Sequence, residues 1–533
     1  SLKREQVAHI FGYAGATICP AVDALKSHPE IGYTLVRTEQ NAGHMASGYA
    51  RISGKVGVCM VTSGPGSTNL ITGIATAYMD SIPMVAITGQ VPSNLLGRDI
   101  FQEVDITGAV APFSKHSYLV KDANDIPRIV KEAFHIASTG RPGPVLIDIP
   151  IDVQEQSLKK FYYPEEVSIR GYKPSVKGND LQIKRVVEAI SRSKQPLICA
   201  GGGVWLADAK EELLELAERC SIPVVKTMMG LGLLPTDHPL NMGMIGAHGN
   251  HCANKALAKA DLLIMVGTRA ADRAMVDPGE IQRRMATIHI DVDPAEIGKN
   301  MQAAIPLVGN VKVILRQILD RDVAATDSAA WLEKLRDYRK AELNRVFPRR
   351  AGSVFPGTVL RRLGARLDDD AVICVDVGQN QIFACKYIPQ KHGRLLTSGG
   401  LGTMGYALPA AVGAKVAGPD RQTLVVCGDG SFQMAMNELA AIRAADMDIK
   451  IVLFRNHTLG LVHQIQSSAP YHGPFGVALD GSPDFETIAA AYLVPCIQVG
   501  DEDHLDEALD RFLGTQGSCL LLCEVHPDVG TND

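Results

Sequence analysis

The sequence predicts an α/β protein built from three doubly wound parallel-sheet domains in series, and three observations carry this prediction. The chain has 533 residues, enough for three or four domains of about 150 residues each. Short β-branched runs recur along it, and many lead through glycines into an apolar-periodic segment of helical length. Glycine is abundant, with 50 residues, as the turns of successive strand–helix units require.

Composition and charge exclude several classes of protein. Hydrophobic residues make up 46% and charged residues 21%, which are ordinary values for folded domains and argue against disorder. The formal net charge of −5 argues against a nucleic-acid partner. No run approaches the roughly 18 apolar residues of a membrane span, so no membrane partner is expected. Eleven cysteines without a CxxC pair indicate reduced thiols and a cytoplasmic location.

The first domain is predicted over residues 1–155. β-Branched and apolar residues place its parallel strands at 33–36, 56–62, 84–87 and 145–149. The segment 156–178 is polar, irregular and interrupted by Pro164 and Pro174, so we expect a linker there.

The second domain is predicted over residues 179–320, with strands at 196–200, 262–266 and 287–291. A charged segment follows over 321–356. It carries Trp331, Leu335 and Tyr338 at helical spacing, so we expect a helical linker.

The third domain is predicted over residues 357–533. Its strands are expected at 371–375, 422–427, 449–454 and 520–525. A helix is expected over 408–416. A second helix, after the glycine turn at 428–430, would bury a stripe of Phe432, Met436, Leu439 and Ile442.

The motif that carries the most chemistry is Gly-Asp-Gly-Ser at 428–431, followed by Asn456. Asp429 and Asn456 each follow a predicted strand, and ligands bind at the carboxyl ends of parallel strands. A carboxylate and an amide oxygen suit Mg²⁺, which leaves room for phosphate oxygens. The turn also begins a helix, whose free N–H groups attract anions. The alternative is a glycine turn with an Asx cap.

Other motifs are absent or weak. There is no P-loop, no GxSxG and no HExxH. One GxGxxG occurs at 400–405, and by itself it would suggest a dinucleotide fold.

Together, the Gly-Asp-Gly…Asn pair and a segment of the first domain resemble the thiamine-diphosphate (ThDP) enzymes. RTEQNAGHMASGYAR at 37–51 is similar to the family segment that bears an activating glutamate, here Glu39. A carboxyl group bonded to the pyrimidine ring favours the imino tautomer, which removes the thiazolium C2 proton. The resemblance implies a pyrimidine-binding domain, a central Rossmann-like domain and a diphosphate-binding domain.

The resemblance extends over the whole chain and sharpens to the acetolactate synthase (acetohydroxyacid synthase) large subunits. It rests on the segments 62–70, 77–83, 101–103, 140–145, 290–298 and 399–405. It implies that Glu39 and Gln102 are catalytic and that Asp429, Asn456 and the Thr458 carbonyl bind the metal. The ThDP-binding residues that it implies are Pro65, Asn69, Val377, Gly378, Gln379, Asn380, Gly402, Met404, Gly430, Ser431, Leu459, Gly460, Leu461 and Val462.

Synthases of this family also carry a non-redox FAD, which would make the chain a flavoprotein. The resemblance places it on Arg141, Gly202, Gly203, Thr227, Gly246, His248, Gly267, Arg269, Arg273, Asp291, Asp293 and Glu296. A glycine run after a strand lets the backbone approach a pyrophosphate, and acidic residues after another strand accept from ribose. As a pattern, this domain could equally be an empty Rossmann-like spacer.

The function implied is a ThDP-dependent carboligase of branched-chain amino acid biosynthesis. It would decarboxylate pyruvate and join the two-carbon unit to a second 2-keto acid. Ile465 stands where the family has Trp, and the FAD contacts are altered. The alternatives are therefore another ThDP-dependent 2-keto acid decarboxylase, an aldehyde carboligase or a sulfoacetaldehyde acetyltransferase. A non-catalytic nucleotide-binding protein is a further hypothesis, against which the intact Glu39, Asp429 and Asn456 argue.

The resemblance also implies partners. Glu39 and Asp429 would meet across a subunit boundary, so a homodimer is the expected minimum and a homotetramer the expected assembly. A small regulatory subunit is a further expected partner, and 2-keto acids are the expected substrates.

Overall fold

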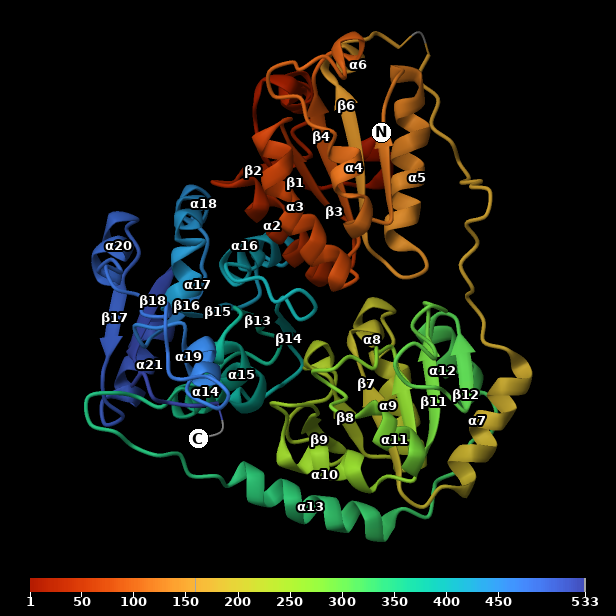
Figure 1. The fold of residues 1–533 in the computed structure, drawn as a ribbon, viewed down its shortest axis with the longest axis vertical. Helices are drawn as coiled ribbons and strands as arrows, with labels where there is room; N and C mark the ends of the chain where they lie inside the picture. Colours follow the sequence, from red (N-terminus) through yellow and green to blue (C-terminus); the bar gives the residue numbers. More distant parts are fainter. Residues whose placement is uncertain (159, 532–533) are drawn as a thin grey trace.

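Three six-stranded parallel sheets, each flanked by helices, form the fold (Figure 1). The computed structural model describes residues 1–158 and 160–531. The strand orders are β2-β1-β3-β4-β6-β5, β12-β11-β10-β7-β8-β9 and β14-β13-β15-β16-β18-β17. Each order reverses direction beside the first strand of its domain, as in doubly wound sheets. The predicted fold class is confirmed.

The first sheet belongs to the N-terminal part of the chain. Its strands are β1 (His9–Tyr13), β2 (Gly32–Leu35), β3 (Gly57–Val61), β4 (Met84–Gln90), β5 (His116–Leu119) and β6 (Pro144–Pro150). Its helices are α1 (Cys19–Ala24), α2 (Glu39–Ser53), α3 (Pro65–Met79), α4 (Ile106–Ala109), α5 (Ile126–Ser138) and α6 (Ile151–Gln154). In Figure 1 residues 160–178 lead to the middle domain.

The middle sheet contains β7 (Pro196–Ala200), β8 (Val224–Lys226), β9 (Asn241–Met244), β10 (Leu262–Val266), β11 (Ala286–Asp291) and β12 (Ile305–Val308). Its helices are α7 (Asp180–Arg192), α8 (Gly202–Leu206), α9 (Lys210–Cys220), α10 (His251–Lys259), α11 (Pro278–Arg284) and α12 (Val311–Leu319). The expected connector helix is α13 (Ala329–Leu343), which buries Trp331 and Leu335 against this domain.

The third sheet contains β13 (Val372–Val375), β14 (Arg394–Leu396), β15 (Thr423–Gly428), β16 (Lys450–Arg455), β17 (Cys496–Val499) and β18 (Cys519–Glu524). Its helices are α14 (Pro356–Arg366), α15 (Gln379–Tyr387), α16 (Ala407–Ala417), α17 (Asp429–Gln433), α18 (Leu439–Ala444), α19 (Gly460–Gln466), α20 (Phe485–Ala491) and α21 (Leu505–Gly514). Across the described residues, no helix is both long and apolar enough to span a bilayer.

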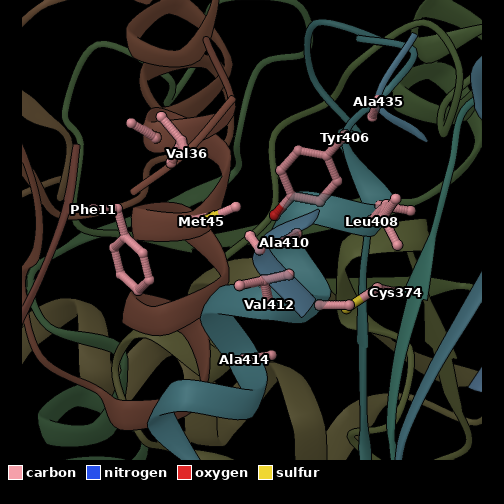
Figure 2. Packing of buried hydrophobic residues seen from close by; sticks show 14 of the residues in the cluster. Phe11, Val36, Met45, Cys374, Tyr406, Leu408, Ala410, Val412, Ala414 and Ala435 are labelled. Atoms are coloured by element: carbon pink, nitrogen blue, oxygen red, sulfur yellow. The ribbon is translucent and has the colours of Figure 1, made fainter. Parts of the chain in front are cut away.

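Helices α2 and α16 join the first and third domains through one shared core (Figure 2). Gly48 and Gly413 let the two backbones touch, because a Cβ on Gly48 would lie 2.0 Å from the Ala410 carbonyl oxygen. A Cβ on Gly413 would lie 1.8 Å from the Met45 carbonyl oxygen. The Ser47 and Tyr406 hydroxyls share a hydrogen bond of 3.0 Å across the same contact. This packing fixes how the first domain sits on the third.

The prediction of a single helix after the glycine turn is wrong. The segment breaks into α17, a 3-10 turn over Met436–Glu438 and α18. The break turns the Glu438 side chain inward, where Oε1 accepts from the backbone N–H groups of Arg37 (2.8 Å) and Thr38 (3.3 Å). Glu438 thereby holds the backbone just before α2 from another domain, and this tertiary contact outweighs the helical pattern of the segment.

Candidate active site

A cavity of about 140 Å³ opens at the carboxyl edge of the third sheet. Three helices begin at it, α15 after Gly378, α17 after Gly428 and α19 after Leu459. In α17 the Ser431 hydroxyl accepts from Gly428 N–H (3.2 Å) and Asp429 Oδ1 accepts from Gly430 N–H (2.9 Å), whereas α15 and α19 have no side-chain cap. Free N–H groups at helix starts attract anions, and these helices begin where the sequence predicts the diphosphate.

Asp429 and Asn456 meet at this cavity, as predicted, because β15 and β16 are neighbours and parallel. Asp429 Oδ2 accepts from the N–H groups of His457 (2.7 Å) and Asn456 (3.2 Å), and Oδ1 accepts from Gly430 N–H (2.9 Å). Burial raises the pKa of Asp429, and these backbone donors oppose that effect. The described residues contain no cluster of three His, Cys, Asp or Glu for a metal. Among the described residues that line the cavity, Asp429 is the one carboxylate, and Asn456 and Thr458 add neutral oxygens, a donor set that suits Mg²⁺.

Most of the predicted ThDP residues of the third domain line the same cavity, and so does Thr458, which was predicted to bind the metal. The ThDP residues are Val377, Gly378, Gln379, Asn380, Met404, Gly430, Ser431, Leu459, Gly460, Leu461 and Val462. Gly402 does not line it and instead takes a left-handed turn, φ 77°, two residues before Met404. Glycine is needed at position 430 of the cavity wall, because a Cβ on Gly430 would lie 2.9 Å from Leu459 Cδ2.

Sequence reasoning missed several residues of this site. Pro356, Phe383, Phe454 and Val525 also line the cavity. Gln379 Nε2 donates to the Val529 carbonyl (2.8 Å) and to Gln464 Oε1 (3.2 Å). These contacts tie the C-terminal segment to the cavity wall. Neither motif spacing nor hydrophobic period gives a signal for such long-range pairs.

A second group of predicted residues gathers at the carboxyl edge of the first sheet. Asn69 Nδ2 donates to Glu39 Oε2 at 3.0 Å, which leaves Oε1 without a hydrogen bond to this neighbour. A Cβ on Gly66 would lie 3.4 Å from Glu39 Oε1, so glycine keeps space beside that oxygen. Gln102 has a left-handed backbone, φ 64°, and packs against Gly64. Pro65 and Asn69 are exposed.

The two groups do not share a cavity within one chain. Among the described residues, those that line the 140 Å³ cavity all lie between Pro356 and Val525. Neither Glu39 nor Gln102 is one of them. Each domain therefore presents half of the predicted site.

The middle domain brings together most residues predicted for FAD. Gly203 N–H donates to the Gly267 carbonyl (2.9 Å), and a Cβ on Gly203 would lie 2.7 Å from Gly267 Cα. Thr227 N–H donates to Ala200, the residue that ends β7. Arg141 reaches from the first domain, and its Nη1 donates to Glu296 Oε1 (3.1 Å) and Asp293 Oδ2 (3.3 Å).

Of the remaining predicted FAD residues, Asp291, Arg269 and Gly246 make close contacts, whereas the Arg273 side chain is exposed. Asp291 Oδ1 accepts from Asp293 N–H at 2.9 Å, and burial raises the pKa of Asp291. Arg269 Nη2 donates to the Met79 carbonyl at 3.1 Å. Gly246 packs on the Arg273 backbone, next to His248. The Arg273 side chain, however, is 78% exposed.

A buried carboxyl group braces the segment that carries Gln102. Asp148 accepts from Thr88 Oγ1 (2.6 Å) and Gln90 Nε2 (3.0 Å), and Gln90 Nε2 also donates to the Val104 carbonyl (2.8 Å). Burial raises the pKa of Asp148 to about 7. Sequence reasoning missed this residue, because a lone Asp in an apolar strand does not identify its partners.

Asp148→Asn is expected to flatten the pH dependence of stability. The folded carboxyl keeps its proton up to about pH 7 while the unfolded one loses it near pH 4, so the free energy of unfolding falls as pH rises across this window. The effect is up to roughly 4 kcal/mol, at about 1.4 kcal/mol per pKa unit. Thermal melting at pH 5 and pH 7.5 measures it, with the exposed Asp23→Asn as control. If the melting temperature changed between pH 5 and pH 7.5 by the same amount in Asp148→Asn as in the wild type, the raised pKa of Asp148 would be contradicted.

Comparison with known proteins agrees with this geometry. The chain matches the thiamine pyrophosphate enzyme family in three segments. They are the N-terminal TPP binding domain over residues 1–109, the central domain over 183–318 and the C-terminal TPP binding domain over 376–523. Fold and candidate site together define the class of thiamine pyrophosphate enzymes.

Full-length relatives narrow the class. A protein described as "Probable acetolactate synthase large subunit" from Methanocaldococcus jannaschii is 43% identical, over 99% of this chain and 91% of its own. The acetolactate synthase large subunit of Corynebacterium glutamicum is 42% identical, over 96% of this chain and 83% of its own. That of Lactococcus lactis is 40% identical, over 96% and 88%. The chain belongs to the acetolactate synthase large-subunit family of ThDP enzymes.

Proposed function

We propose that this chain is the catalytic subunit of an acetolactate synthase, which decarboxylates pyruvate and joins the two-carbon unit to a second 2-keto acid. The observation that carries the proposal is the pair of half-sites. Glu39 with Asn69 forms one, and Asp429 with Asn456 at the anion cavity forms the other. The full-length likeness to acetolactate synthase large subunits supports it. The pathway that we propose is branched-chain amino acid biosynthesis.

The second half-site fits Mg²⁺ and the diphosphate of ThDP. Asp429, Asn456 and the Thr458 carbonyl would hold the metal, and the helix starts at Gly378, Gly428 and Leu459 would hold phosphate oxygens. When bound, ThDP supplies a thiazolium ring that stabilises negative charge on the carbon left by decarboxylation.

The first half-site would exchange a proton with the pyrimidine ring of ThDP. Asn69 fixes Glu39 Oε2, so Oε1 is the oxygen free to share a proton with the pyrimidine ring nitrogen. Gln102, held beside Gly64, would present its amide to the keto acid. Met404, at the cavity of the third domain, would support the bend between the two rings of the cofactor.

A product assay tests the proposal. Purified protein is given pyruvate, ThDP and Mg²⁺, with and without FAD. Acetolactate as the product is the expected result. Acetaldehyde and CO₂ without acetolactate would instead indicate a 2-keto acid decarboxylase. An absence of pyruvate consumption would overturn the synthase assignment and favour another donor, with sulfoacetaldehyde tested first.

FAD is the third cofactor that we propose. The contact of Gly203 with Gly267 and the reach of Arg141 to Asp293 and Glu296 support it, because close backbone approach suits a pyrophosphate. Its role would be non-redox, since the reaction transfers no net electrons. The product assay with and without FAD tests this proposal. If FAD-free protein formed acetolactate as fast without added FAD as with it, the proposal would be contradicted.

Asp429→Asn is expected to raise the dissociation constant of ThDP measured with Mg²⁺ by at least tenfold. The substitution removes the one carboxylate near the metal while Asn keeps the acceptor for the His457 and Asn456 N–H groups. Isothermal titration measures the change. Asp446→Asn, an exposed position in the same domain, is the control. Wild-type affinity would rule out Asp429 as a metal ligand.

A homodimer at minimum, and a homotetramer as the full assembly, are the quaternary states that we propose. The two half-sites of one chain lie apart, and Pro65 and Asn69 are exposed, so a partner is needed to bring Glu39 to a diphosphate site. The relatives' description as large subunits supports a small regulatory subunit as a further partner. A cytoplasmic location is proposed on the eleven unpaired cysteines.

Coexpression of Glu39→Gln with Asp429→Asn is expected to restore activity that neither variant has alone. In a mixed dimer one site combines the intact Glu39 of one chain with the intact Asp429 of the other, so random mixing gives about a quarter of wild-type activity. Specific activity of the copurified mixture measures this. If each chain built its own site, the mixture would stay inactive.

A further inference from the structure

A second, larger cavity of about 460 Å³ lies where all three domains meet. It opens at the amino-terminal ends of the first sheet, beside His9, Val56 and Pro83, which is the edge opposite Glu39. Trp205 of α8 and Arg394 at the start of β14 complete its wall. In Figure 1 this edge of the first domain faces α8. No residue predicted for ThDP or FAD lines it.

The cavity carries positive charge that the described residues do not balance. The Arg51 side chain is 3% exposed and pairs with Asp80 at 2.7 Å, but its buried Nε has no hydrogen-bond partner. Arg394 donates to the Arg51 carbonyl and makes no ion pair among the described residues. Lys55 lies at the wall and is also outside every ion pair described. Lys131, by contrast, is neutralised by Glu5 at 3.2 Å.

Unbalanced charge at a cavity calls for a counter-ion. Burial and the nearby Arg51 lower the pKa of Arg394 to about 9, so the guanidinium is still charged at neutral pH. A charge that is largely shielded from water is destabilising when it has no counter-ion. An anion in the cavity would supply the counter-ion that Arg394 lacks among the described residues.

The other walls supply an apolar surface and a suitable size. The Trp205 ring lies 5.0 Å from the Arg394 guanidinium, and Phe134 and Val7 line the same space. Small-molecule sites have volumes of roughly 300–1,000 Å³ and combine apolar walls with a few polar groups. The cavity falls in that range.

We propose that this cavity binds a small organic anion, a carboxylate or a phosphate ester with an apolar body. Its charged oxygens would contact Arg394 and Lys55, and its body would lie on Trp205. The site connects to the candidate active site through one arginine. Asp80, the partner of Arg51, accepts from Gly400 N–H at 2.7 Å, four residues before Met404.

Trp205 provides a reporter, because the chain has only two tryptophans and the other, Trp331, is buried in the middle domain. Trp331→Phe protein saturated with ThDP and Mg²⁺ is titrated with benzoate, phenyl phosphate and neutral benzyl alcohol. We expect a saturable change in Trp205 fluorescence with benzoate or phenyl phosphate, and binding of benzyl alcohol at least roughly tenfold weaker. The stronger of the two anions identifies the headgroup.

Variants locate the binding. Arg394→Gln is expected to weaken it at least roughly tenfold, and Arg394→Lys to restore part of the affinity. Lys55→Gln, an exposed change that spares the core, is expected to weaken it as well. Lys210→Gln is the matched control, because Lys210 stacks on Trp205 (5.3 Å) but does not line the cavity. No saturable response to either anion, equal binding of benzyl alcohol, or unchanged affinity in Arg394→Gln and Lys55→Gln would overturn the proposal.

Discussion

Glu39→Gln is expected to lower kcat by about 10² to 10⁴ while leaving the affinity for ThDP within a few-fold of wild type. Gln can still accept the hydrogen bond of Asn69 Nδ2, which is 3.0 Å long in the native chain. The amide nitrogen of Gln then stands where Glu39 has Oε1, and it cannot exchange a proton as a carboxyl oxygen can. That exchange is the only role we assign to Glu39 Oε1. The substitution therefore separates proton transfer from folding and binding.

Steady-state kinetics with pyruvate and a titration with ThDP test this expectation together. Glu30→Gln, an exposed carboxylate in the same domain, is the control. Turnover at the wild-type rate would show that the proposed proton exchange is not needed. Loss of ThDP binding with an intact fold would make Glu39 a binding residue rather than a proton carrier.

The placement of Asp429 beside Asn456 was predictable from sequence because its geometry is local. Asp429 follows one buried strand and Asn456 follows the next, and parallel neighbours meet at their carboxyl ends. The strands at 196–200 and 262–266 were also placed with the right bounds, since each is a fully buried apolar run. Short or polar edge strands such as β5, β9, β14 and β17 gave no comparable signal.

Tertiary contacts explain what the sequence could not predict. The segment after Asp429 has a helical stripe, yet the helix breaks at Glu438, which accepts from the N–H of Arg37 just before α2, 401 residues earlier in the chain. The pairing of Gln379 with Val529 and the stacking of Arg394 on Trp205 depend on the same kind of distant contact. No local period or motif records such partners. The sequence therefore predicted the candidate binding residues of the site but not the distant residues that hold them in place.

Gly48→Ala is expected to destabilise the protein by about 3 kcal/mol or more, although the residue lies in no half-site. In an open helix the same change would stabilise by up to about 1 kcal/mol, because alanine is the better helix former. Here the new Cβ would lie 2.0 Å from the Ala410 carbonyl oxygen. That oxygen belongs to backbone and cannot turn away as a side chain can, so α2 and α16 must separate.

The separation has a consequence for catalysis. α2 begins at Glu39, and α16 follows the turn that carries Met404, so both half-sites shift when the two helices move apart. Thermal melting and ThDP binding of Gly48→Ala measure the two effects. Gly514→Ala is the matched control, because Gly514 lies in helix α21 with no atom within 4 Å of its added Cβ. If both variants gained stability alike, α2 and α16 could not be in contact, and the shared core of the first and third domains would be refuted.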